Sequence, residues 1–300
     1  PLRRDHLEQT VPVVVEVVDE RGAAVVDAQF TSDAVADRLT GTDGLIELDL
    51  SQPVAGVLTA AGKLDEPLVL APADDRVTVV MFDRQSASGL RVAYHFGGDT
   101  MLGRRYQTPG RDGTAVADDA DGARAVVDDL AAVSGAADLT VVNVETVIGD
   151  LPADQALAAK RFLISSPPQL VDALRELGVD AVALGNNHAN DWGDTGVLST
   201  LSALGPSNIA VTGAGLSAEE ALRGVVLPVG DRQVGLISAT TVNGDFVNDQ
   251  LPDADAGQPA DLPTSEAWQY DARTFGFGAE GEPGYLASAP RRPGEAWRLY

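Results

Sequence analysis

Apolar and polar positions alternate along the first part of the chain. Residues 45–50 place Ile46, Leu48 and Leu50 on one face and acidic side chains on the other, which is typical of a half-buried strand. Five further runs have the length and composition of strands: 11–18, 24–30, 54–59, 66–70 and 76–82. The pattern predicts a small all-β sandwich domain over residues 1–87.

The hydrophobic period changes after a short predicted linker at residues 84–89. Strand patterns now alternate with helical stripes, which predicts an α/β domain with a mainly parallel sheet and helices on both faces, over residues 90–300. The predicted strands are 91–98, 139–144, 179–184, 209–212 and 234–239, and the predicted helices are 118–133, 166–177, 195–204 and 218–222.

Composition narrows the function classes. The 300 residues include 45 acidic and 21 basic side chains, a net charge of −24, which excludes a sequence-general nucleic-acid binder and repels anionic membranes. The chain has no cysteine, which excludes disulfides and thiolate metal sites. No run approaches the roughly 20 apolar residues that span a bilayer. Because Pro1 is not a natural start residue, we expect a trimmed or mature chain with any signal or anchor upstream.

Polar side chains gather where three predicted strands end. Asp99 ends the first, Glu145 follows the second, and Asn187 and His188 follow the third. In an open α/β sheet, ligands bind beyond the carboxyl ends of the strands. Carboxylate and amide oxygens suit Mg²⁺ or Mn²⁺, and an imidazole transfers protons near neutral pH. The three ends together predict a metal site.

Each of these residues also has a structural interpretation. Asp99 could cap the turn after its strand, Glu145 could be a solvated carboxylate, and Asn187 could bond local backbone. His95 lies inside a predicted strand, which favours a packed or edge histidine over a ligand. His6 lies in a terminal segment, where we expect no function.

Four motifs carry a resemblance to a known family. They are the segments 98–104 (Gly-Asp-Thr-Met-Leu-Gly-Arg), 143–145 (Asn-Val-Glu), 186–193 (Asn-Asn-His-Ala-Asn-Asp-Trp-Gly) and 213–215 (Gly-Ala-Gly). Their order and spacing over residues 91–241 resemble the CapA family of poly-γ-glutamate capsule biosynthesis proteins. That family's domain is similar to the calcineurin-like metallophosphoesterases, so the resemblance implies a layered metallophosphoesterase-like fold. Residues 1–87 resemble the carboxypeptidase-regulatory β modules.

The CapA resemblance implies roles for individual residues. Asp99, Glu145 and Asn187 would bind a divalent metal, with Mn²⁺ or Mg²⁺ expected, and His188 would be the catalytic general acid. Four further residues would contact the substrate or support the ligands: Arg104, Asn143, Asn186 and Asp191.

One departure from the family pattern concerns histidines. The family continues with a His-Trp-Gly motif and a Gly-His-x-His motif that supply metal ligands, whereas this chain has no histidine after His188. We therefore expect a C-terminally truncated domain, in which the metal could be absent.

The resemblance implies a protein of the cell envelope, outside the cytoplasm, that takes part in the synthesis, export or processing of poly-γ-glutamate or a related polymer. It would be a metal-dependent hydrolase whose partners are an anionic polymer or phosphoester, and other capsule-synthesis membrane proteins. The alternative is a non-catalytic assembly factor that binds polymer. A minor alternative is dinucleotide binding, because Gly213 and Gly215 form a Gly-x-Gly turn and Asp231 lies near the distance of a ribose-binding acid. A tight turn beside the main site is the simpler role for these glycines.

Overall fold

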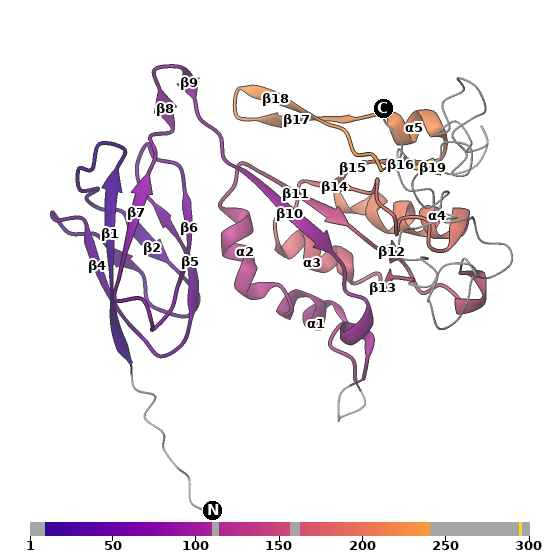
Figure 1. The fold of residues 1–300 in the computed structure, drawn as a ribbon, viewed down its shortest axis with the longest axis horizontal. Helices are drawn as coiled ribbons and strands as arrows, with labels where there is room; N and C mark the ends of the chain where they lie inside the picture. The colour runs from indigo at the N-terminus through magenta and orange to yellow at the C-terminus, as the bar shows by residue number, and fades with distance from the viewer. Residues whose placement is uncertain (1–9, 110–113, 157–162, 241–293, 296–300) are drawn as a thin grey trace, which may run out of the picture. The chain divides into compact units, whose positions relative to one another are not determined.

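The computed structural model describes residues 10–109, 114–156, 163–240 and 294–295. The chain divides into two compact units (Figure 1). The first comprises Pro1–His95 with Val127–Leu139 and Val229–Asp231, and the second comprises Phe96–Val126, Thr140–Pro228 and Arg232–Tyr300. None of the described helices is long and apolar enough to cross a membrane.

Two larger β-sheets form the body of the first unit. One has the order β4-β1-β7, with β1 antiparallel to β4 and parallel to β7, and the other has the order β3-β2-β5-β6 with antiparallel neighbours. The strands are β1 (Val11–Asp19), β2 (Gln29–Thr31), β3 (Arg38–Leu39), β4 (Leu45–Leu50), β5 (Val54–Thr59), β6 (Glu66–Leu70) and β7 (Arg76–Met81).

Buried side chains from both sheets form one hydrophobic core. In β4, Ile46, Leu48 and Leu50 are buried while the acidic residues between them are exposed, as the alternation predicts. Phe30 of β2 and Leu58 of β5 join the same cluster from the other sheet. The two sheets therefore bury their inner faces against each other, which confirms the all-β character predicted for this segment.

The predicted linker at residues 84–89 forms a small hairpin instead. Strands β8 (Gln85–Ser86) and β9 (Gly89–Leu90) pair antiparallel, and the Ser86 hydroxyl donates to the carbonyl of Gly89. Ser86 and Gly89, whose φ is +115°, close a tight turn, so the predicted linker has a regular local structure.

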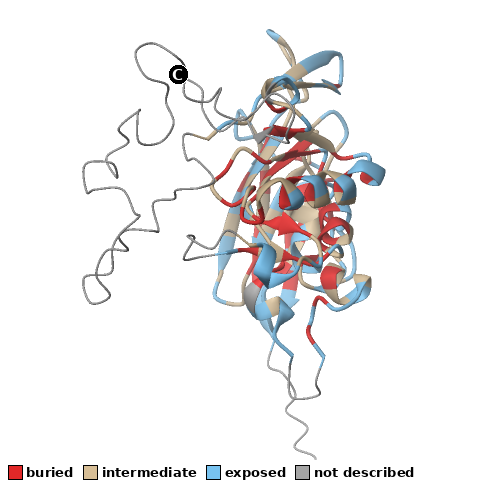
Figure 2. Cartoon of the chain, turned by 90° about the vertical axis from the view of Figure 1, so that its right-hand side faces the viewer, coloured by how far each residue is buried: buried red, intermediate tan, exposed pale blue. Residues whose placement is uncertain are grey.

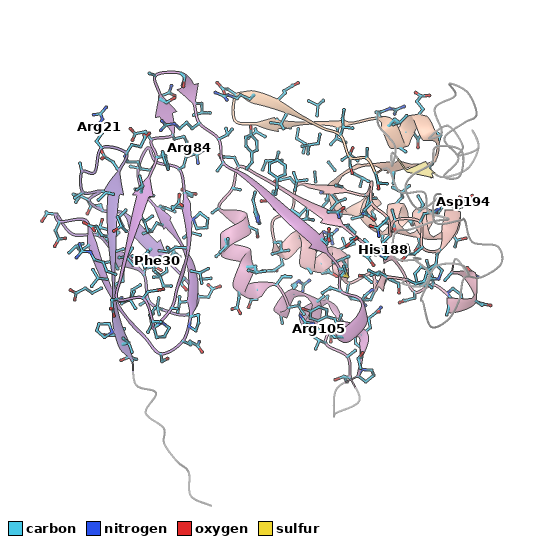
Figure 3. All side chains as sticks on the ribbon, in the orientation of Figure 1. Arg21, Phe30, Arg84, Arg105, His188 and Asp194 are labelled. Atoms are coloured by element: carbon cyan, nitrogen blue, oxygen red, sulfur yellow. The ribbon has the colours of Figure 1, made fainter. Side chains whose placement is uncertain are left out.

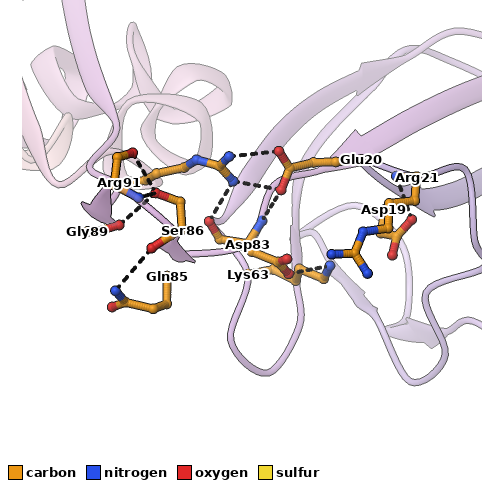
Figure 4. Close-up of polar contacts among 10 residues, drawn as sticks. Asp19, Glu20, Arg21, Lys63, Asp83, Gln85, Ser86, Gly89 and Arg91 are labelled. Carbon is orange, nitrogen blue, oxygen red and sulfur yellow. Dashed lines mark hydrogen bonds and ion pairs between the residues drawn. The ribbon is translucent and has the colours of Figure 1, made fainter.

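Ion pairs flank this hairpin, and Figure 4 shows those made by Arg91 and Lys63. The Arg91 guanidinium binds both carboxylate oxygens of Glu20, at 2.7 and 2.8 Å, and also donates to the carbonyl of Asp83. Lys63 pairs with the Asp83 carboxylate at 2.7 Å. At the other end of the hairpin, Arg84 pairs with Asp138 at 2.8 Å.

The second unit is built around a sheet of order β10-β11-β14-β15. Its strands are β10 (Tyr94–Thr100), β11 (Leu139–Val144), β14 (Ala181–Ala183) and β15 (Ala210–Thr212). The last three are parallel, so their carboxyl ends lie at one edge. Next to this edge, β12 (Val147–Ile148) and β13 (Ser165–Ser166) form a short parallel pair.

Helices α3 (Leu170–Glu176), α4 (Gly193–Leu204) and α5 (Ala218–Leu222) form near their predicted positions. In α3 the apolar stripe is buried, and Gly178, whose φ is +66°, follows the C-cap residue Leu177. Figure 2 shows buried residues along the strands and on the inner sides of the helices.

The single helix predicted over 118–133 is wrong. Two short helices, α1 (Ala120–Ala125) and α2 (Asp128–Gly135), flank a break at Val127, where φ is −114° and ψ is −3°. Adjacent β-branched valines weaken the helix there, and two aspartates favour a new helix start after them. Leu130 of α2 is 55% exposed as a result.

The predicted strand 234–239 does not continue the parallel sheet. Its residues contribute to β18 (Arg232–Leu236), which pairs with β17 (Val225–Val229) in a two-stranded sheet. Gly230, with φ of +61°, allows the tight turn between them. The structure thus confirms parallel strands combined with helices, while the layered metallophosphoesterase-like arrangement stays a prediction.

Candidate functional site

A chain of side-chain hydrogen bonds joins the ends of β10, β11 and β14. The Asn143 Nδ2 group donates to the Asp99 Oδ1 atom at 2.7 Å, and the Asn143 Oδ1 atom accepts from Asn186 Nδ2 at 3.0 Å. A carboxylate only accepts, so Asp99 fixes which way the Asn143 amide points. Three residues from three predicted motifs therefore come together at one edge of the sheet.

Asn186 uses its whole amide group to fold the turn after β14. Its Nδ2 group also donates to the Val144 carbonyl at 2.8 Å, while its Oδ1 atom accepts the backbone N–H groups of His188 and Ala189, both at 2.9 Å. The residue is only 6% exposed. These bonds use the donors and the acceptor of the Asn186 amide and support the backbone at His188.

His188 is paired with a fully buried carboxylate. Its Nδ1 atom lies 2.8 Å from Asp191 Oδ2, and the exposed fractions of the two residues are 6% and 0%. The same Oδ2 atom accepts the backbone N–H of Ile164 at 2.6 Å. An ionised Asp191 requires the proton of neutral His188 to sit on Nδ1. The Nε2 atom is then the position that can accept or deliver a proton, as general acid–base chemistry needs.

Glycines allow the turn after β14 and the turn after β15 to lie in close contact. Gly213 has φ of +95°, and a Cβ atom there would lie 2.4 Å from the Gly185 nitrogen. The Gly185 N–H in turn donates to the Ser238 hydroxyl at 2.9 Å. A Cβ at Gly215 would meet Glu220 at 2.4 Å, and α5 has only five residues. Packing therefore accounts for both glycines of the Gly-x-Gly turn without a nucleotide.

The described residues offer only part of a metal-binding set. No three His, Asp or Glu side chains come together as a metal-binding group in the parts of the chain that the structure describes. The three predicted ligands are hard oxygen donors, and Asp99 is exposed with its carboxylate oriented by Asn143. Glu145 and Asn187 are partly exposed at the ends of their strands, and both make interactions within the protein.

The remaining predicted residues are placed as follows. Arg104 starts the 3₁₀ helix η1 (Arg104–Gln107), and its side chain lies outside what the structure describes. His95 lies in β10, with a buried Nδ1 atom that has no hydrogen-bond partner among the described residues. His6 lies outside the described residues. Sequence patterns did not predict the roles of Ile164 and Ser238. Ile164 bonds Asp191 through its backbone N–H, and Ser238, which accepts the Gly185 N–H, lies outside the four motifs.

Residues 94–275 match the model of the family described as bacterial capsule synthesis protein PGA_cap. The match covers more than half of the chain and includes every residue of the hydrogen-bonded site. The chain belongs to the PGA_cap family. This agrees with the CapA resemblance of the four motifs, and it places the Asp99, Asn143 and Asn186 network within the PGA_cap segment.

No curated protein matches the sequence. Two solved structures show weak likeness. The Bacillus anthracis TIE protein is 9% identical, with 30% of this chain and 19% of that chain covered and a TM-score of 0.21. The structure of the Streptococcal ancillary pilin is 16% identical, with 36% and 38% covered and a TM-score of 0.21. The chain thus spans well under two thirds of either protein, and neither likeness informs its fold.

Proposed function

We propose that this PGA_cap protein works in the cell envelope on poly-γ-glutamate or a related acidic polymer, in its synthesis, export or processing. Family membership supports a capsule-related role. We also propose that the protein lies in the cell envelope and that its partners are the polymer and other capsule-synthesis membrane proteins. The finer proposal is that the site around His188 hydrolyses an amide or phosphoester bond.

The His188–Asp191 pair is the observation that carries the hydrolase proposal. A buried carboxylate at 2.8 Å holds the imidazole by Nδ1 and fixes its orientation, as a carboxylate does for a catalytic histidine. His188 would then deliver a proton from Nε2 to the leaving group. Asn186 helps to hold the backbone of this turn by accepting the His188 N–H.

A divalent ion fits the oxygen donors of Asp99, Glu145 and Asn187, although these residues alone do not complete a binding site. Further ligands would have to come from outside this set. When bound, such a metal would activate water and neutralise anionic oxygens. The part played by this chain's own residues is to orient Asp99 through Asn143 and to hold the His188 proton through Asp191.

The test compares cleavage by the wild-type protein and variants in the presence of Mn²⁺. Mass spectrometry would follow the length of a γ-glutamate oligomer, and absorbance would follow bis(p-nitrophenyl) phosphate. We expect His188→Gln to lower the rate by about 100-fold or more, in the range of lost general acid catalysis. His95→Gln is the matched control and should keep the wild-type rate.

Cleavage that persists in His188→Gln would contradict the hydrolase proposal. Firm oligomer binding by the wild-type protein without cleavage of either substrate would favour the alternative, a non-catalytic assembly factor. That alternative gains support from the incomplete set of metal ligands in the described part of the chain.

A further inference from the structure

Arg105 of η1 is held in a defined position by its neighbour Tyr106. The guanidinium carbon lies 4.8 Å from the centre of the Tyr106 ring, and Nη2 donates to the phenolic oxygen at 2.7 Å. The Tyr106 carbonyl in turn accepts the N–H of Ala117 at 3.1 Å. Stacking on an aromatic ring reduces the conformational freedom of a long, exposed side chain.

Arg105 differs from other arginines of the second unit in what it binds. Arg124, Arg175 and Arg223 each form ion pairs with aspartate or glutamate side chains. Arg105 is exposed, and no carboxylate of the described residues lies within ion-pair distance of it. In a chain with a net charge of −24, an ordered arginine that the described acidic residues leave unpaired is available to an anion from solution.

The segment before η1 contacts β13, which follows the residue that bonds Asp191. Figure 3 labels Arg105 and His188 in this unit. Leu102 donates its N–H to the Ser166 hydroxyl at 2.9 Å. A Cβ atom at Gly103 would lie 2.5 Å from the Ser165 carbonyl, so the backbone passes closely over β13. The residue before β13, Ile164, donates to Asp191, the partner of His188.

From this arrangement we propose that Arg105, pre-oriented by Tyr106, binds a carboxylate of the anionic polymer chain that occupies the His188 site. The inference rests on the proposed function, because it assigns a specificity-determining residue to that site. A planar guanidinium binds a carboxylate through two parallel hydrogen bonds, which a lysine cannot reproduce. A polymer with one carboxylate per residue presents such a group next to every bond.

The test measures binding of a fluorescent γ-glutamate decamer by anisotropy, with a glycerol-phosphate oligomer as a second anionic probe and an amidated, neutral decamer as the blank. We expect Arg105→Gln to weaken binding of the γ-glutamate decamer by about tenfold or more, which is the typical loss of a charge-assisted pair. Arg105→Lys should recover only part of this loss. Tyr106→Leu should weaken binding while leaving the charge unchanged.

Arg38→Gln is the matched control, because it removes the same charge from an exposed arginine of the first unit whose bonds go to backbone carbonyls. If Arg38→Gln and Arg105→Gln weaken binding of the γ-glutamate decamer equally, the change in net charge explains the loss and the inference is overturned. Wild-type binding that Arg105→Gln leaves intact would overturn it too, while the proposed function stands. Arg105-dependent binding of the glycerol-phosphate oligomer alone would support the subsite and overturn the choice of poly-γ-glutamate. Failure of the wild-type protein to bind either anionic probe would overturn both proposals.

Discussion

Asn186 shows how a residue within a sequence motif can support the local structure. The CapA resemblance implies that Asn186 contacts the substrate or supports the metal ligands. In the structure its amide makes four hydrogen bonds, to Asn143, Val144, His188 and Ala189. A buried amide with complete bonding stabilises one conformation, because every alternative leaves polar groups unpaired.

Replacing Asn186 by alanine should therefore lower the stability of the fold. We expect Asn186→Ala to reduce the free energy of unfolding by about 2–4 kcal/mol, since it leaves buried backbone groups without partners. Urea denaturation followed by circular dichroism measures this. Asn190→Ala, four residues further along the same turn, is the control and should change stability by less than about 0.5 kcal/mol. Equal effects of both changes would show that the Asn186 bonds are not special.

At the scale of elements, close backbone contacts position the site. The turn after β15 lies so near the turn after β14 that Gly213 has no room for a side chain beside Gly185. Such contacts keep the carboxyl ends of parallel strands together, where the polar residues of the motifs are delivered. Gly213 also has positive φ, which adds a conformational requirement to the steric one.

Two alanine substitutions separate these requirements. Gly213→Ala should destabilise the protein by about 2–4 kcal/mol, because it combines left-handed backbone with a clash against backbone atoms. Gly193 also has a positive φ, of +58°, but a Cβ atom there would have no neighbour within 4 Å. We therefore expect Gly193→Ala to lower the free energy of unfolding by only about 1 kcal/mol. Thermal unfolding of both variants beside the wild type gives the comparison. A Gly193→Ala loss as large as that of Gly213→Ala would contradict the role of the close contact.

Sequence patterns predicted elements whose side chains follow one clear period. The alternation in 45–50 and the stripe of α3 are both found, because burial of one face determines each. The break at Val127 and the pairing of β18 with β17 were not predicted, because tertiary contacts decide them. Hydrogen bonds join Asp99, Asn143 and Asn186 of the motifs at the strand ends, while the predicted metal site stays a prediction. The Ile164 bond to Asp191 could not be predicted, since any residue type supplies a backbone N–H.

At the scale of the whole molecule, the excess of acidic groups sets how stability responds to pH. With 45 acidic and 21 basic side chains, the net interaction among the charges is repulsive, and protonating carboxylates relieves this repulsion. Two glutamates of the first unit depart from that background in opposite directions. The Arg91 guanidinium lowers the pKa of Glu20, whereas partial burial in β6 raises the pKa of Glu66.

Opposite pKa shifts predict opposite pH dependences for two variants of equal charge. Because the folded-state pKa of Glu20 is lowered, its contribution to stability is present above about pH 4.3, the value of an unperturbed glutamate, and is lost as pH falls through the folded-state pKa. Glu20→Gln should therefore lower the unfolding midpoint at pH 7, with the difference from wild type shrinking by pH 3.

For Glu66 the favourable contribution is present below about pH 4.3 and is lost as pH rises through the raised pKa. Glu66→Gln should accordingly raise the midpoint at pH 7 relative to wild type. Thermal scans of the three proteins at both pH values measure this, and parallel shifts of the two variants would mean that net charge alone decides the response.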